Sequence, residues 1–228
     1  MNIETPVARP IGPLVHPLPP GTIPDLRTIE GRYVTLEALN PAKHGLDLWN
    51  AVTGHDELWD YLFSGPFADE TSFVDWLATS AAKRDPWFYA YVVDGKALGM
   101  GSFMRADPAN GVIEIGNILV SPALQQTRSS TEATYLFMQH AFEALGCRRF
   151  EWKCNALNAP SIVSAKRFGF TFEGIFRQHM IVKGHNRDTA WFSIIDSEWP
   201  RIKAGFEKWL DPANFDRDGK QKAKLQLG

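Results

Sequence analysis

The amino-acid sequence predicts a mixed α/β (α+β) domain, in which helices flank a central, mostly antiparallel sheet. The main observation is that strand-like and helix-like periodicities follow one another in the order βαα(α)βββαβαββα. A second is the hairpin signal Asp94-Gly95, which separates two strand-like segments as in antiparallel pairs. With 228 residues, 44% of them hydrophobic, the chain can bury a substantial core.

The first half of the domain is predicted to hold four strands and three helices. Pro41 marks a helix start, and apolar residues at Leu48, Trp49 and Val52 follow at helical spacing. Asp69 or Thr71 can cap a later helix with a side-chain oxygen. The predicted strands are 32–38, 87–93, 96–104 and 112–120, and the predicted helices are 41–52, 55–63 and 69–84.

The second half is predicted to continue with a helix, a strand, a helix, a hairpin and a final helix. Ala133, Leu136 and Phe137 share one helical face, and Gly146 ends that helix. The predicted helices are 132–145, 159–168 and 198–210, the strand is 148–154, and the hairpin strands are 172–182 and 188–195 with a loop at 183–186.

Both ends of the chain differ from this domain in composition. Residues 1–27 contain seven prolines, so we expect an extended arm that lies on the domain surface or on a partner subunit. Residues 28–212 form the predicted domain. Residues 213–228 form a polar tail, which we expect to be frayed from about Asp216 onward.

Charge and hydropathy exclude several classes of function. A net charge of −2 gives no attraction to nucleic acid or to an anionic membrane, and no apolar run is long enough to span a bilayer. The N-terminus lacks the basic start and apolar segment of a secretion signal, so the expected location is the cytoplasm. Cys147 and Cys154 have no metal-ligand spacing and lie too far apart on one strand for a disulfide, so we expect neither a metal site nor a disulfide.

The segment 111–133 is the most informative part of the chain. A β-type run ends at Ser121-Pro122, a polar loop follows, and an amphipathic helix then begins. A loop that enters a helix N-terminus offers unpaired backbone N–H groups and the positive end of the helix dipole. Both features suit a phosphate group.

This order of strand, Ser-Pro, glutamine-led loop and helix resembles the acyl-CoA pyrophosphate loop of the GNAT superfamily of N-acetyltransferases. A second stretch, Asn158-Ala-Pro-Ser161 followed by Gly169-Phe170, resembles the family's Asn-x-x-Ser…Gly-Phe helix. The branch that it resembles most contains the RimJ/RimL-type enzymes. The resemblance covers roughly 31–199 and implies the GNAT fold and N-acetyltransferase activity.

The resemblance implies acetyl-CoA as the acyl donor, with no metal. In the family a fourth-strand backbone N–H contacts the thioester carbonyl, which points here to Leu119 and Val120, and Asn158 matches a residue that contacts pantetheine. The loop expected to bind the pyrophosphate has no glycine. Its hydroxyl groups and the Arg128 guanidinium would donate to the phosphates and so replace the close backbone approach that glycines allow. An alternative is a capping box in which Ser129 bonds to the amide of Glu132. The loop residues are Gln125, Gln126, Thr127, Arg128, Ser129 and Ser130.

The resemblance also assigns candidate catalytic residues. Ser161 matches the serine that protonates the departing thiolate, although a hydrogen bond near the helix start explains it equally well. Met180 stands where some relatives carry a glutamate base, and the neighbouring His179 would face the other side of a regular strand. Glu114 is the remaining candidate base, acting through a water, or else it is a solvated strand carboxylate.

The acceptor pocket of this fold lies between the first two helices and the last hairpin. Aromatic side chains there predict a wall against a small-molecule amine, unless they belong to the core. A small amine is therefore preferred over a protein N-terminus, and Arg177 or Arg187 would suit an acidic acyl tip. The candidate acceptor-binding residues are Trp59, Tyr61, Phe63, His179 and Arg187.

Three further possibilities stay open. One is an acyl-CoA-binding module without catalytic activity, and another is an unrelated α/β binding domain whose loop only caps a helix. A homodimer is compatible with the sequence, with the proline-rich arm or the last hairpin crossing to a partner.

Overall fold

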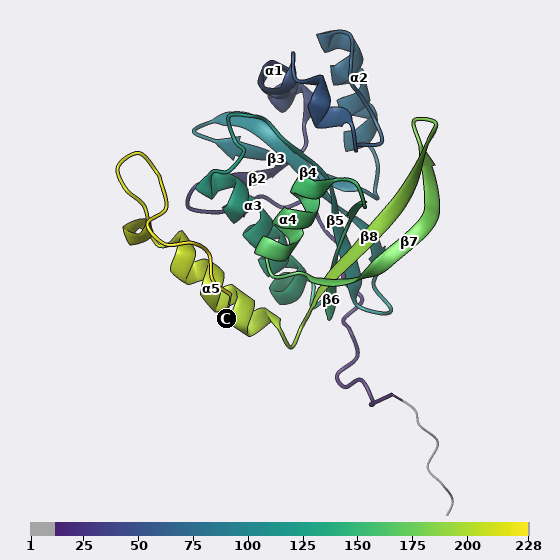
Figure 1. Ribbon diagram of the computed structural model, residues 1–228, viewed down its shortest axis with the longest axis vertical. Helices are drawn as coiled ribbons and strands as arrows, with labels where there is room; N and C mark the ends of the chain where they lie inside the picture. Colours follow the sequence, from purple (N-terminus) through teal and green to yellow (C-terminus); the bar gives the residue numbers. More distant parts are fainter. Residues whose placement is uncertain (1–11, 228) are drawn as a thin grey trace, which may run out of the picture.

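A computed structural model describes residues 12–227 and places them around one eight-stranded sheet (Figure 1). The strand order is β1-β2-β3-β4-β5-β6-β8-β7, and β5 and β6 are the parallel neighbours in an otherwise antiparallel sheet. The predicted fold class is thereby confirmed. The strands are β1 (Ile29–Glu30), β2 (Thr35–Ala38), β3 (Trp87–Val93), β4 (Lys96–Asp107), β5 (Val112–Val120), β6 (Arg149–Asn155), β7 (Thr171–Val182) and β8 (His185–Ile195).

Helices cover both faces of the sheet. Successive residues of a strand point to opposite faces, so neighbouring residues pack against different helices. Tyr89 of β3 belongs to a core cluster with α3 and α5, whereas its neighbour Ala90 belongs to a second cluster with α1 and α2. The helices are α1 (Pro41–Val52), α2 (Glu70–Ala81), α3 (Arg128–Gln139), α4 (Ala159–Arg167) and α5 (Trp199–Leu210), with short turns η1 (Asp56–Trp59), η2 (His140–Ala144, a π-helical turn) and η3 (Pro212–Asn214).

Local capping explains most helix boundaries. Asn40 accepts hydrogen bonds from the N–H groups of Ala42 and Lys43, so α1 begins at Pro41 as predicted. Asp69 caps α2 through the N–H of Ser72, which confirms one of the two predicted caps. The prediction was wrong for α3, which begins at Arg128 rather than at 132.

The feature that positions the site is the divergence of β5 from β6. The two strands pair only from Val112 with Arg149 to Ile115 with Trp152, and beyond that point they separate. On its other side β5 stays paired with β4 up to Val120 opposite Gly99, across a register shift near Asn117, whose φ is 51°. One edge of the second half of β5 therefore carries backbone groups without a strand partner.

The C-terminal segment is docked on the domain, so the expectation of a frayed tail was wrong. Phe215 is buried and bridges to Gln221, and Leu225 and Leu227 pack against the larger core cluster. At the other end Pro19 lies against Gly111, where an added Cβ would come within 2.9 Å of it. Residues 1–11 of the predicted arm lie outside the described residues.

Within residues 12–227, no helix combines the length and the apolar character that crossing a membrane requires.

Candidate active site

The loop before α3 is built around Thr127. Its hydroxyl donates to the carbonyl of Leu124 at 2.8 Å and accepts from the N–H of Ser130 at 3.1 Å. Thr127 is therefore the N-cap of α3, which is why this helix starts earlier than predicted. The Thr127 hydroxyl is occupied by these two bonds, so the loop would bind a ligand mainly through backbone N–H groups.

Gln126 gives this loop its sharp turn without a glycine. Its φ of 59° lies in the left-handed region that glycine usually supplies. A left-handed residue directly before a helix turns successive N–H groups toward one point, which makes an anion-binding concavity. The missing glycines are a departure from the family pattern, and this loop has its left-handed residue at Gln126 instead.

The capping box, which was the alternative interpretation of this loop, does not form between Ser129 and Glu132. The carboxylate of Glu132 instead accepts hydrogen bonds from the backbone N–H groups of Arg32 at 3.0 Å, Tyr33 at 2.5 Å and Val34 at 3.0 Å. Glu132 thus ties α3 to the turn between β1 and β2. Its carboxylate is directed at this turn, where the three N–H donors stabilise its charge.

Arg128 lies at the first position of α3 and leans on aromatic rings. Its guanidinium carbon is 4.3 Å from the ring centre of Tyr33 and 5.4 Å from that of Phe215. Ser129 is buried, and the hydroxyl of Ser130 donates to the carbonyl of Thr127 at 3.0 Å. The positive charge of Arg128 is held at the helix N-terminus by this stacking.

The unpaired edge of β5 faces the space between the diverging strands. The N–H of Ser121 donates to the carbonyl of Leu98 in the neighbouring strand β4. Successive N–H groups of a strand point to opposite sides. The N–H of Val120 therefore faces the open side, and that of Leu119 faces β4. Gln125 closes the end of this edge by donating to the carbonyl of Val120 at 3.2 Å.

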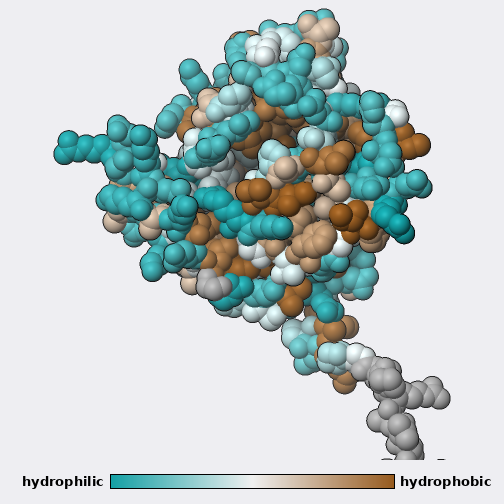
Figure 2. Space-filling view, in the orientation of Figure 1, coloured by the Kyte–Doolittle hydropathy of each residue, from teal (hydrophilic) through white to brown (hydrophobic). Residues whose placement is uncertain are grey.

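Helix α4 borders the opposite side of this space. Asn158 caps it by accepting from the N–H of Ser161 at 3.1 Å. The Ser161 hydroxyl oxygen accepts from the indole N–H of Trp152 at 2.9 Å, and the hydroxyl also hydrogen-bonds the buried Cys154 thiol beside it. Figure 2 shows that the surface is hollowed between α3 and α4, with apolar side chains gathered over α4. Val163 of α4 and Leu157, which precedes this helix, are exposed.

Glu114 lies in an ion-pair network. Its carboxylate, 3% exposed, contacts the Lys153 ammonium at 2.9 Å and the Arg105 guanidinium at 3.1 Å. Lys153 also pairs with Glu151 at 2.6 Å and stacks 3.9 Å from the ring centre of Trp191. Glu114 is thus a buried, paired carboxylate. Sequence analysis missed Lys153, and its alternation with Glu151 on one face of a predicted strand was the available signal.

His179 lies on the same face as this network. The register of β7 against β8 shifts between Phe176 and Met180, and Gln178 has a φ of 50°. This bulge breaks the regular alternation on which the sequence argument about His179 relied. The Nδ1 atom of His179 lies 3.0 Å from the Thr189 hydroxyl. Partial burial, with the nearby cations of Arg105, Arg187 and Lys153, lowers the pKa of His179.

The aromatic segment after η1 meets the hairpin. The Tyr61 hydroxyl donates to the Leu157 carbonyl at 3.2 Å, and the Arg187 guanidinium carbon lies 5.1 Å from the ring centre of Phe63. Tyr61 and Phe63 are exposed, but Trp59 is buried among Phe67, Phe73 and Trp76 in the second core cluster. The expectation of Trp59 as an acceptor-binding side chain is corrected accordingly, because its ring contacts the core.

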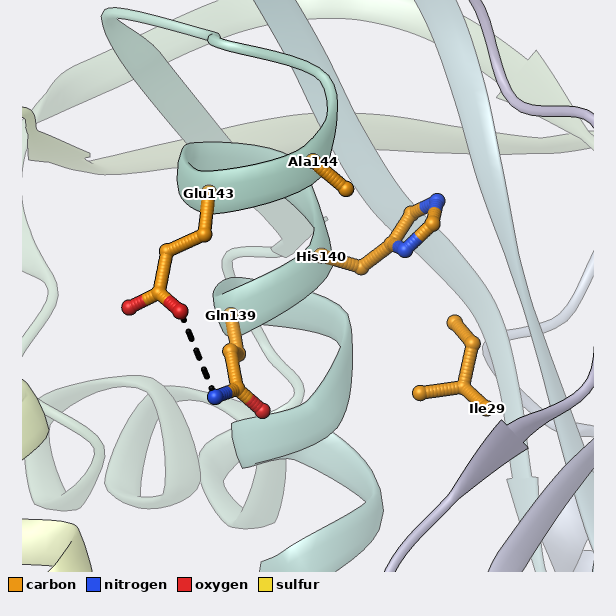
Figure 3. A pocket seen from close by; sticks show the side chains of 5 residues that line it. All are labelled: Ile29, Gln139, His140, Glu143 and Ala144. Atoms are coloured by element: carbon orange, nitrogen blue, oxygen red, sulfur yellow. Dashed lines mark hydrogen bonds between the residues drawn. The ribbon is translucent and has the colours of Figure 1, made fainter.

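Two cavities lie away from the divergence of the strands. One of about 630 Å³ is lined by Arg177, Gln178, Asn186 and Asp188 on the β7–β8 hairpin. The other, of about 270 Å³, lies beside η2 and is lined by Ile29, Gln139, His140, Glu143 and Ala144. Figure 3 shows the imidazole of His140 turned toward Ile29 and away from the Gln139–Glu143 hydrogen bond.

Comparison with known proteins agrees with this arrangement. A family model described as an acetyltransferase (GNAT) domain matches residues 34–171. A GCN5-related N-acetyltransferase structure from Brucella melitensis is 49% identical, with a TM-score of 0.88 over 92% of this chain and 96% of that one. A structure of a GNAT-family acetyltransferase from Chromobacterium violaceum is 42% identical, with a TM-score of 0.78 over 86% of this chain and 100% of that one.

A curated relative adds a functional name. YdaF of Bacillus subtilis, which is named as a ribosomal N-acetyltransferase, is 29% identical over 106 residues. The match covers 46% of this chain and 57% of YdaF, so the chain spans little more than half the length of that relative.

Proposed function

The chain belongs to the GNAT family of acetyltransferases and is an N-acetyltransferase, and from this premise we propose that it acetylates the α-amine of a protein or peptide N-terminus. The observation that carries the acetyl-transfer part of the proposal is the pairing of two features. One is the left-handed Gln126 before the N-terminus of α3, and the other is the open edge of β5 beside it. The family implies acetyl-CoA as the donor.

The described residues fit that donor. The α3 N-terminus offers N–H groups and a dipole to the pyrophosphate, with Arg128 supplying positive charge at the same helix end. The edge of β5 would accept the pantetheine arm as an added strand, with the Val120 N–H directed at the thioester carbonyl. Asn158 and Ser161 lie across the gap on α4.

The reaction needs one nucleophilic attack and two proton movements. The neutral amine nitrogen attacks the thioester carbonyl carbon, and the C–S bond breaks as the amide bond forms. The amine loses a proton, which we assign to His179, because its lowered pKa keeps the imidazole neutral and its Nε2 has no partner among the residues the structure describes. The departing thiolate takes a proton from the Ser161 hydroxyl. Water returns a proton to Ser161, and His179 releases the amine proton to solvent, so both side chains regain their starting forms.

Two observations favour an N-terminal acceptor over the small amine that the sequence analysis preferred. The aromatic wall assumed there loses Trp59 to the core, and Tyr61 and Phe63 are its exposed members. An open site suits a peptide chain. The name of YdaF supports the same acceptor class.

Binding of the donor is tested by isothermal titration of acetyl-CoA into the full chain. We expect micromolar affinity, weakened at least about tenfold in Arg128→Glu and unchanged in the matched control Arg84→Glu, which lies after α2. S-acetylpantetheine, which lacks the pyrophosphate, should bind both Arg128 forms alike. Absence of acetyl-CoA binding by the unaltered chain would overturn the proposal.

The acceptor is tested with acetyl-CoA and a set of short peptides, monitored by mass spectrometry. We expect acetylation of free α-amines and none of peptides whose α-amine is already blocked but whose lysines are free. Turnover of small amines alone, with no peptide modified, would return the assignment to the small-amine class.

A further inference from the structure

Arg187 is a buried cation that has no paired carboxylate among the residues that the structure describes. Its side chain on β8 belongs to a residue that is 6% exposed. Within residues 12–227 no ion pair or hydrogen bond reaches its guanidinium, and its Nε atom is sealed from solvent without a partner. Removing a charged group from water without pairing it is costly, so such a group requires an explanation.

The other buried cation of this face shows the contrast. Lys153, whose side chain is 5% exposed, has two carboxylate partners, Glu114 and Glu151. Glu114 is the carboxylate whose charge acts on Arg187, and its oxygens are already held by Lys153 and Arg105. The charge balance around Arg187 is therefore positive, and none of the described residues supplies a carboxylate that pairs with it.

Arg187 places this unpaired charge at the surface where we expect the acceptor to bind. Its guanidinium lies beside Phe63, in the segment that Tyr61 joins to Leu157 and that Lys183 joins to the carbonyl of Trp59. The ring of Phe63 fixes the guanidinium plane from one side. His179, the proposed proton acceptor, lies near enough for the charge of Arg187 to lower its pKa.

We infer that Arg187 binds a carboxylate of the acceptor, so that the preferred substrate is a peptide with an aspartate or glutamate among its first residues. This inference rests on the proposed function and adds the chemical class of its substrate. Arginine is suited to the role because its planar fork binds both oxygens of a carboxylate. A buried, uncompensated guanidinium gains most from such a partner, since desolvation has already been completed in the free protein.

The test uses pairs of peptides that differ only by an acid and its isosteric amide. Aspartate and asparagine are exchanged at the first, second and third positions of otherwise identical C-terminally amidated peptides. We expect kcat/KM for acetyl transfer to favour one acidic peptide by at least about tenfold over its amide partner. Arg187→Gln should abolish that preference through KM, whereas Arg84→Gln should retain it. Loss of the Arg187 charge also acts on the pKa of His179, so any change in kcat should be the same for the acidic peptide and its amide partner.

Two further comparisons test whether the carboxylate that binds Arg187 comes from a source other than an acidic peptide side chain. A preference confined to free amino acids over their amides would place the partner on a free α-carboxylate and overturn the peptide class. A preference for succinyl-CoA over acetyl-CoA that Arg187→Gln removes would place it on the acyl group and overturn the inference.

Folding and basal function are checked independently. Acetyl-CoA titration reports whether Arg187→Gln is folded. If it is not, Arg187→Lys replaces it in the test. This variant keeps the charge but lacks the planar fork, so it should retain only part of the preference for the acidic peptide. Peptide acetylation with no acid preference in the unaltered chain would overturn the inference and leave the proposed function standing. Acetyl-CoA binding without acetylation of any peptide would overturn both.

Discussion

The Nδ1 atom of His179 on β7 lies 3.0 Å from the hydroxyl oxygen of Thr189 on the neighbouring strand β8. Thr189 is 1% exposed, so the contact fixes an imidazole on the outer face of the hairpin to a buried point. Phe176 and Trp191 pack against the same ring, with centroids at 5.5 and 6.1 Å. His179 is thereby held in one orientation with Nε2 directed away from Thr189.

This arrangement predicts the pH dependence of activity. A lowered pKa means that His179 stays neutral to a lower pH than an ordinary histidine, so the acidic limb of kcat/KM should lie below about pH 6.5. His179→Gln should lower kcat by about 10²-fold or more and remove that limb. Rates measured across pH with a saturating donor check both points. A variant that keeps the limb would show that another group takes the proton.

Glu132 provides a test of stability that is separate from catalysis. Its carboxylate accepts hydrogen bonds from three backbone N–H groups. In Glu132→Gln an NH₂ group, which cannot accept a hydrogen bond, would face one or more of these donors. We expect the free energy of unfolding to fall by about 2–3 kcal/mol, measured by urea denaturation. Glu70→Gln, in the exposed first turn of α2, should change it by less than about 0.5 kcal/mol.

The elements that the sequence predicted well are those with local causes. Asn40 and Pro41 start α1, and Asp94-Gly95 closes the β3–β4 hairpin, because a cap or a turn depends only on neighbouring residues. The start of α3 was missed because Ser129, Ser130 and Thr131 read as loop residues, although Thr127 caps the helix before them.

The parts that could not be predicted depend on contacts between distant segments. Glu132 bonds to residues about a hundred positions earlier, and no local pattern announces that partnership. The bulge near Gln178 depends on its N–H donating to Asp188 of the next strand at 2.7 Å. It decides where His179 points, so periodicity alone could not place that side chain.

Gln126 tests whether the loop conformation governs donor binding. A β-branched residue is strongly disfavoured at a φ of 59°, so Gln126→Val should cost about 1–3 kcal/mol of stability or force the loop to change shape. Gln126→Gly should accept the conformation and keep the affinity for acetyl-CoA. Titration calorimetry of both variants checks this. Equal affinity in the valine variant would mean that the left-handed turn is not needed.

His140 predicts a loss of stability on acidification. It is 7% exposed with an unpartnered Nε2, and burial lowers its pKa. The folded state therefore takes up a proton less readily than the unfolded state, so stability is complete above the unfolded pKa of about 6.5 and decreases as pH falls below it. His140→Phe should remove this part of the slope between about pH 7.5 and about 5.5, measured by urea denaturation at each pH. An unchanged slope would show that His140 does not contribute.

The network around Lys153 separates a structural from a catalytic role for Glu114. Lys153→Met should cost about 3–5 kcal/mol, because it leaves the buried carboxylates of Glu114 and Glu151 without their shared cation. Adding Glu114→Gln to that variant removes one uncompensated charge and should restore part of the loss.

Kinetics of Glu114→Gln alone then decide the role of this carboxylate. The carboxylate is buried and its oxygens are engaged by Lys153 and Arg105, so no free oxygen faces an amine and we expect kcat to change by less than about tenfold. A fall of about 10³-fold with acetyl-CoA affinity intact would instead identify Glu114 as the base, acting through a water. The assignment of His179 would then be withdrawn, since one attack by a neutral amine needs only one proton acceptor.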